Sequence, residues 1–142
     1  MSSVPYIPEG FHTVTPYFVV SDGPAFLTFL KQAFGAEERF VHRTSEGRIM
    51  HGEVRLGDSI VEFGEGSEQW PAMRLNIHLY VPDTDAVYRR ALEAGAKSLR
   101  EPKNEFYGDR SAGIEDPAGN IWFLATHIED VTPEEMARRA AK

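Results

Sequence analysis

Residues 105–127 read EFYGDRSAGIEDPAGNIWFLATH, and this stretch decides the fold. Its centre, Asp116-Pro117-Ala118-Gly119-Asn120, is a tight-turn sequence, because proline presets φ at the second turn position and glycine and asparagine accept positive φ. The residues after the turn, Ile121 to His127, are aromatic, apolar and β-branched, which favours a strand buried on one face. The stretch therefore predicts two strands joined by a tight turn.

Outward from this hairpin, strand and helix patterns follow one another in the same order twice. Each half begins with a strand, continues with a helix whose apolar residues recur at helical spacing, and ends with three strand-like segments. In the second half the helix begins at Asp83 or Thr84 and Gly95 ends it. We expect strands at residues 15–20, 39–43, 49–56, 59–63, 75–81, 97–99, 109–115 and 121–127. Gly57-Asp58 reads as a tight hairpin turn.

The two halves match at a single offset. Val20 corresponds to Val81 and Asp22 to Asp83, each pair 61 residues apart. We therefore predict an α+β fold of two βαβββ modules in one chain, whose curved sheets surround a cleft. The alternative is an α+β sandwich in which the repeat is coincidental. The expected organisation is one domain over residues 1–142, with modules at about 12–64 and 73–127, a linker at about 65–72 and a C-terminal helix at about 132–141.

Composition limits the partners and the chemistry. The chain has no cysteine, which excludes disulfides, thiolate metal sites and cysteine nucleophiles. Fifteen basic and 22 acidic residues give a formal charge of −7, which argues against nonspecific binding of nucleic acid. Neither a signal peptide nor a membrane-spanning run is found in the sequence, so we expect a cytoplasmic protein with no membrane partner. A small molecule is the expected ligand.

Several motifs together resemble one family. They are Gly10-Phe11-His12-Thr13-Val14-Thr15-Pro16-Tyr17, Lys31-Gln32-Ala33-Phe34-Gly35-Ala36-Glu37, Tyr107-Gly108-Asp109-Arg110, Asp116-Pro117-x-Gly119-Asn120-x-Trp122 and Ala125-Thr126-His127-x-Glu129-Asp130-Val131. The chain is similar to the PhnB-like branch of the vicinal oxygen chelate superfamily, which groups glyoxalase I, bleomycin-resistance proteins and ring-cleaving dioxygenases. The resemblance implies the paired βαβββ fold and a homodimer. It does not identify a reaction, because the superfamily includes many enzymes and some proteins that only bind.

The resemblance also implies where a metal would be bound. Carried over to this sequence, the superfamily's ligand positions are Thr15, Glu62, Asn76 and Phe123, and the 61-residue offset relates them in pairs. Only Glu62 is a good ligand, since threonine and asparagine offer weak neutral oxygens and phenylalanine has no donor. We therefore expect no metal cofactor. A slip of two residues in this register would spoil the 61-residue offset, which argues against such a slip.

A second interpretation keeps a metal. His78 lies two residues beyond Asn76 on the same strand face. If the register is wrong by two, His51, Glu62 and His78 form a two-histidine, one-carboxylate site for one divalent ion. The chain would then be a metal-dependent lyase of the glyoxalase type or an extradiol-type dioxygenase. Otherwise His78 is a half-buried, hydrogen-bonded strand histidine.

The hypothesis we favour is a small-molecule binding protein without the usual metal ligands, and no catalytic residue is assigned. The expected ligand-binding residues are Tyr17, His51, Glu62, Asn76, His78, Tyr107, Arg110 and Phe123. Glu62 either faces the ligand or faces solvent, and Arg110 either holds an anion or pairs with Asp109 or Glu115. Trp70 and Phe106 would extend an aromatic wall. A protein-interaction module with a filled cleft is the third possibility.

Overall fold

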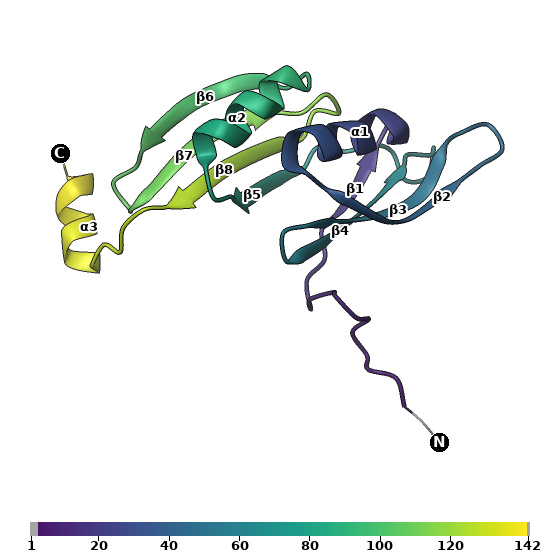
Figure 1. Cartoon of the computed structure of the whole chain (residues 1–142), viewed down its shortest axis with the longest axis horizontal. Helices are drawn as coiled ribbons and strands as arrows, with labels where there is room; N and C mark the ends of the chain where they lie inside the picture. The colour runs from purple at the N-terminus through teal and green to yellow at the C-terminus, as the bar shows by residue number, and fades with distance from the viewer. Residues whose placement is uncertain (1–2, 142) are drawn as a thin grey trace. The chain divides into compact units, whose positions relative to one another are not determined.

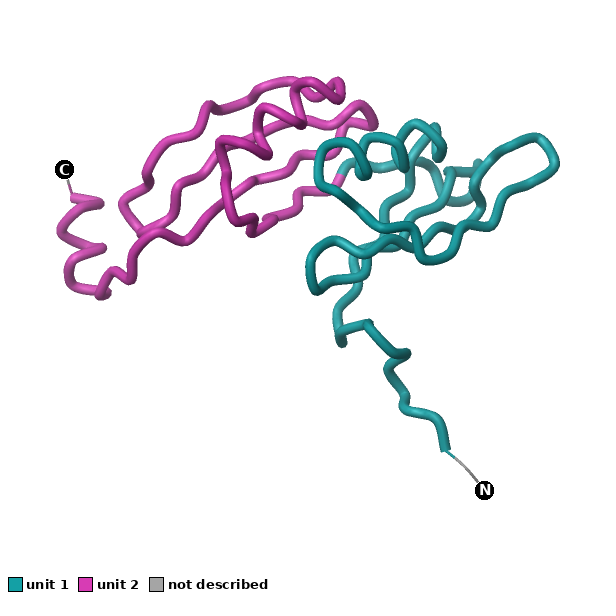
Figure 2. The backbone as a smooth tube through the Cα atoms, viewed as in Figure 1, with its two compact units in different colours: residues 1–74 teal, residues 75–142 magenta. Residues whose placement is uncertain are grey.

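The computed structural model describes residues 3–141 and divides the chain into two compact units, Met1–Arg74 and Leu75–Lys142 (Figure 2). Each unit carries one strand, one helix and three further strands, which confirms the predicted α+β fold with two βαβββ modules (Figure 1). The first unit contains β1 (Tyr17–Val20), α1 (Gly23–Phe34), β2 (Glu37–Arg43), β3 (Ile49–Leu56) and β4 (Ser59–Glu65). The second contains β5 (Asn76–Tyr80), α2 (Thr84–Glu93), β6 (Lys97–Asn104), β7 (Asp109–Glu115), β8 (Ile121–His127) and α3 (Pro133–Ala140). No helix among the described residues has the length and apolar character needed to cross a membrane.

The two sheets have the same topology. Their strand orders are β1-β4-β3-β2 and β5-β8-β7-β6. The first strand of each unit pairs in parallel with the last, and the remaining pairs are antiparallel. The parallel pair therefore lies at one edge of each sheet, and its first strand leads directly into the helix.

Helix α1 covers one face of the first sheet. The Asp22 side chain caps its N-terminus, and Gly35 ends it with a φ of 68°, a left-handed value that glycine adopts at little cost. Its apolar face is buried. The ring centroid of Phe26 lies 5.1 Å from that of Phe18 in β1 and 5.4 Å from that of Phe63 in β4. This cluster of aromatic rings fills the core of the first unit, so the opposite sheet face is left open for other side chains.

A buried carboxylate ties three segments of the first unit together. Glu65 ends β4, and its Oε2 accepts hydrogen bonds from the backbone amides of Gly23 at 3.1 Å and Ile49 at 2.8 Å. Its Oε1 accepts one from Arg48 at 2.8 Å. Burial acts to raise the pKa of Glu65, but the hydrogen bonds from Arg48, Ile49 and Gly23 outweigh it and lower that pKa. The carboxylate therefore stays charged and fixes the start of α1 against β3 and β4.

In the second unit the predicted turn between β7 and β8 is closed by Asp116, which is buried. Its carboxylate accepts from the amides of Ala118 and Asn120 at 2.8 and 3.0 Å. It also accepts from the Trp122 indole nitrogen at 2.8 Å. Asn120 in turn accepts from the Leu75 amide at 3.0 Å, just before β5. One side chain thus connects the turn, the core tryptophan and, through Asn120, the neighbouring strand.

Five of the eight predicted strands have different bounds in the structure, and two of these differences have a clear physical reason. The first begins at Tyr17, because Thr15 and Pro16 precede the ladder and only the Pro16 carbonyl contributes, to the Glu62 amide at 2.9 Å. The strand predicted at residues 97–99 continues to Asn104. Its polar side chains and Pro102 do not give the apolar pattern of a strand, so the sequence did not predict this continuation. Proline is tolerated here because β6 is an edge strand, where a missing N–H costs no ladder hydrogen bond.

We predict that Asp116→Ala lowers the free energy of unfolding by about 3 kcal/mol, because several buried donors lose their acceptor together. Urea unfolding followed by the fluorescence of the buried Trp122 measures this, in a Trp70→Phe background that removes the other indole signal. Asp58→Ala, at an exposed hairpin turn, is the matched control and should change little. A loss below 1 kcal/mol for Asp116→Ala would contradict the role assigned to this carboxylate.

Candidate functional site

The open face of the first sheet carries a pocket of about 430 Å³. It is lined by Tyr17, Val19, Met50, Gly64, Glu65, Ser67 and Trp70. Three of these are large and exposed to solvent: Tyr17 at 44%, Met50 at 50% and Trp70 at 70%. Aromatic and apolar side chains thus surround most of the pocket, which suits an apolar or planar ligand.

One wall of the pocket is the loop predicted as a linker. Ser67 and Trp70 hold each other in a turn, with the Ser67 amide donating to the Trp70 carbonyl and the Trp70 amide to Ser67 Oγ. The Gly66 and Met73 amides donate to the carbonyls of β1, and Met73 forms an isolated bridge with Val19. The loop is therefore attached to the sheet edge, and the indole of Trp70 is held beside the pocket.

Gly64 forms the floor. A Cβ added there would lie 2.6 Å from the backbone oxygen of Met50 and 2.8 Å from the Tyr17 hydroxyl. Any side chain at this position would therefore move the β3 backbone and fill the space under Tyr17.

A polar cluster lies on the same sheet face. His51 and Glu53 of β3 and Glu62 of β4 each place one ligand atom within 4.8 Å of the others. His51 Nε2 lies 3.3 Å from Glu53 Oε1 and 3.5 Å from Glu62 Oε2. The His51 ring also packs near two aromatic rings, with centroids 6.1 Å from Tyr17 and 6.2 Å from Phe40. Tyr17 therefore borders both the cluster and the pocket.

The strand pairing corrects the register expected for the metal positions. Tyr17, not Thr15, lies opposite Glu62, and in the second unit His78, not Asn76, lies opposite Phe123. Both first strands are displaced by two residues, so the 61-residue offset survives. The expectation that a slip of two residues would spoil the offset is therefore wrong.

The predicted residues of the second unit lie as follows. His78 is exposed on β5, and its ring centroid is 4.8 Å from that of Tyr80. Asn76 is exposed at the start of β5, opposite Ile121. Phe123 is half-buried, and the Arg100 guanidinium lies 5.9 Å from its ring centroid. Tyr107 packs edge-on against Phe106 in the turn before β7, with centroids 5.2 Å apart.

Arg110 has a structural partner that was not expected. Its Nε and one terminal nitrogen donate to both carboxylate oxygens of Asp85, at 2.8 and 3.0 Å, and not to Asp109 or Glu115. Its other terminal nitrogen donates to Asn104 at 3.1 Å. The hydrogen bond from Arg110 lowers the pKa of Asp85. This bidentate ion pair joins α2 to β7. It occupies the guanidinium N–H groups that an anionic ligand would need as donors.

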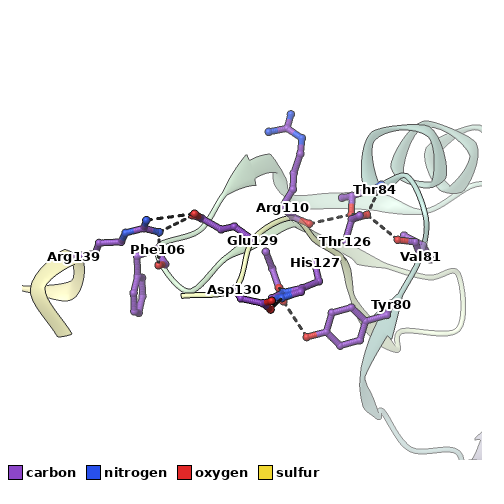
Figure 3. Close-up of polar contacts among 11 residues, drawn as sticks. Tyr80, Val81, Thr84, Phe106, Arg110, Thr126, His127, Glu129, Asp130 and Arg139 are labelled. Carbon is purple, nitrogen blue, oxygen red and sulfur yellow. Dashed lines mark hydrogen bonds and ion pairs between the residues drawn. The ribbon is translucent and has the colours of Figure 1, made fainter. Parts of the chain in front are cut away.

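A histidine network lies at the end of the second sheet where β7 begins and β8 ends (Figure 3). The buried Asp109 carboxylate lies 2.8 Å from His127 Nδ1 and accepts from the Tyr80 hydroxyl at 3.0 Å. His127 Nε2 lies 2.7 Å from Asp130, whose side chain is exposed. The hydrogen bonds to Asp130 and Asp109 raise the pKa of His127. The network fastens the end of β8 to the segment that leads into α3.

The same view shows how α3 is attached. Arg139 donates to Glu129 Oε1 at 2.7 Å and to the Phe106 carbonyl at 3.2 Å (Figure 3). The helix therefore contacts the turn that precedes β7 through one arginine.

Two residues of the cluster and the pocket were missed or undervalued in the sequence analysis. Glu53 is not among the residues predicted for the site, although it lies two residues from His51 on the same strand. The signal was present, because a two-residue turn at Gly57-Asp58 pairs Leu56 with Ser59 and, three residues further on, Glu53 with Glu62. Trp70 was expected only as part of a general aromatic wall, since nothing in its loop sequence predicts attachment to β1.

The fold and the residues of this chain match known proteins. The model of the Glyoxalase/Bleomycin resistance protein/Dioxygenase superfamily matches residues 10–124. An uncharacterised protein of Mycobacterium bovis is 29% identical over 134 residues, which cover 87% of this chain and 88% of that protein. Among solved structures, TioX from Micromonospora sp. ML1 has a TM-score of 0.72 at 20% identity and covers 82% of this chain and 99% of its own. A superfamily member from Sphaerobacter thermophilus has a TM-score of 0.66 at 22% identity. The match covers 87% of this chain and 98% of that protein.

We predict that the stability contributed by His127 falls as the pH rises. A histidine whose pKa is raised by folding stabilises the protein fully below its unfolded pKa, and this contribution is lost as the pH passes the higher folded pKa. The difference in unfolding free energy between the wild type and His127→Gln should therefore be larger at about pH 5.5 than at about pH 9. Urea titrations at the two pH values measure it, with His12→Gln as the control. A difference that is constant or grows with pH would show that the network does not hold a charged histidine.

Proposed function

The chain belongs to the Glyoxalase/Bleomycin resistance protein/Dioxygenase superfamily, and from its pocket we propose that it is a small-molecule binding protein of that superfamily. The observation that carries the proposal is the 430 Å³ pocket lined by Tyr17 and Trp70. Its volume lies in the usual range for small-ligand sites, and its aromatic side chains remain exposed instead of filling the space.

The lining favours a neutral, planar or apolar ligand. Glu65 is the only charged residue of the lining, and its oxygens already accept from Gly23, Ile49 and Arg48. A ligand therefore gains little from Glu65 and gains mainly from contact with the indole and phenol rings. The Ser67 hydroxyl is the polar group next to Trp70, although it already accepts from the Trp70 amide.

We propose that this binding needs no metal at the positions related by the repeat. In the corrected register those positions are Tyr17, Glu62, His78 and Phe123, of which only Glu62 and His78 are good ligands. Two donors are fewer than the three protein ligands usual for a catalytic metal ion.

The alternative function is a metal-dependent lyase or dioxygenase that uses His51, Glu62 and His78. The 3.5 Å distance from His51 Nε2 to Glu62 Oε2 supports two of these three ligands. The third ligand would be His78 of the second unit, so the alternative requires that His78→Ala abolish both metal binding and activity.

We also propose that the protein belongs to the PhnB-like branch and forms a homodimer. The branch is supported by Tyr107-Gly108-Asp109-Arg110 and by the Asp116-Pro117-x-Gly119-Asn120-x-Trp122 turn. A two-fold dimer is the commonest closed assembly, and the resemblance to this branch implies one. Sedimentation equilibrium should give twice the mass of one chain, and a single-chain mass at micromolar concentration would contradict the dimer.

We predict that Trp70→Ala weakens binding of the neutral planar dye Nile red at least tenfold, because the indole supplies a large part of the contact area. A titration followed by dye fluorescence, with EDTA present, measures the dissociation constant without any contribution from metal. Tyr6→Ala removes an exposed aromatic side chain that does not line the pocket and is the matched control. Equal affinity of the wild type and Trp70→Ala would contradict ligand binding in this pocket.

A further inference from the structure

We propose that His51, Glu53 and Glu62 bind one divalent metal ion on the open face of the first sheet. The inference goes beyond the proposed function, because none of the three residues lines the pocket. It also differs from the repeat-related positions, since two of its three ligands, His51 and Glu53, come from β3. All three ligands belong to two adjacent strands of one sheet.

The first support is an uncompensated pair of like charges. Glu53 and Glu62 lie directly opposite each other on β3 and β4, where like charges destabilise a sheet. Their side chains are only 20% and 24% exposed, so solvent screens them incompletely. Within residues 3–141, no lysine or arginine forms an ion pair with either carboxylate, and His51 is the partner of both. A bound cation would remove this repulsion.

The second support is the spacing of the donor atoms. The distances of 3.3 and 3.5 Å from His51 Nε2 to the two carboxylates exceed the roughly 2.9 Å usual for N–H···O hydrogen bonds. They are close to the separation of two ligands on a tetrahedral zinc ion, about 3.3 to 3.4 Å when the bonds are about 2.0 to 2.1 Å long. The side chains thus need little movement to converge on one ion.

The donor types decide the class of metal. One imidazole nitrogen and two carboxylate oxygens suit Zn²⁺ and related transition metals better than Mg²⁺ or Ca²⁺, which prefer oxygen ligands alone. Three protein ligands also leave a coordination position for water or for an oxygen of a bound molecule. Tyr17 and Phe40 flank the His51 ring and restrict its orientation, which reduces the entropy lost when the ion binds.

Isothermal titration with Zn²⁺ of the tag-free, full-length protein, stripped of metal with EDTA and then desalted, tests the proposal. The expected result is one ion per chain, with binding weakened at least tenfold by each of His51→Ala, Glu53→Gln and Glu62→Gln. His78→Ala and His12→Ala are the matched controls and should bind as the wild type does. Zinc should also raise the melting temperature of the wild type, and this increase should be lost in the same three variants.

The double variant Glu53→Gln/Glu62→Gln keeps the test independent of folding. Removing the like charges should leave the metal-free protein at least as stable as the wild type, so its failure to bind zinc reports on the site alone. Wild-type affinity in His51→Ala or in the double variant would overturn the proposal. Loss of binding in His78→Ala with retention in Glu53→Gln would also overturn it, in favour of the two-histidine set. Nile red binding in EDTA is measured separately, so the pocket and the metal site can fail independently.

Discussion

The carboxylate of Asp116 receives hydrogen bonds from three residues of its own hairpin, including the core residue Trp122, and through Asn120 the turn also holds the start of β5. Because the group is buried, each donor would be unsatisfied without it. Glu65 has the corresponding role in the first unit, where it joins the start of α1 to β3 and β4. Each unit thus depends on one buried acidic side chain that links segments distant in sequence. In the first unit this side chain also borders the pocket, so the structural carboxylate and the pocket share one residue.

Equivalent backbone positions in the two units carry different side chains. The amide of Gly23, at the start of α1, donates to Glu65, whereas the amide of Thr84, at the start of α2, donates to the Thr126 hydroxyl. Both pairs obey the 61-residue offset. The same holds for Glu62 and its counterpart Phe123, one a carboxylic side chain and the other an apolar ring. In the first unit this face carries a pocket and a donor cluster, whereas the same sheet face of the second unit carries the Arg100 and Phe123 contact.

Much of this fold can be predicted from local signals, because turn residues, helix caps and alternating apolar residues depend on near neighbours. The turn at Asp116 and the cap at Asp22 are examples. The register of β1 against β4 could not be predicted in this way. A shift of two residues keeps every side chain on its face, so Thr15 and Tyr17 satisfy the pattern equally. The metal positions carried over to the sequence depend on that register, and therefore Thr15 and Asn76 lie two residues before the residues that pair with Glu62 and Phe123. The wall formed by Trp70 depends on long-range backbone hydrogen bonds that leave no pattern in the sequence.

The constant offset between the units is the pattern that duplication of one βαβββ segment would leave. When one backbone arrangement occurs twice, the side chains of one unit can differ while the other unit keeps its own. The amides at the starts of α1 and α2 illustrate this, because different side chains accept from them. Thr126 holds the start of α2 with a group that does not ionise, whereas Glu65 performs the same task with a charge at the border of the pocket. Selection could thus alter the face beside Glu65 without rebuilding the backbone beneath it. The repeat therefore allows side chains on the sheet face beside Glu65 to change while the backbone of both units stays the same.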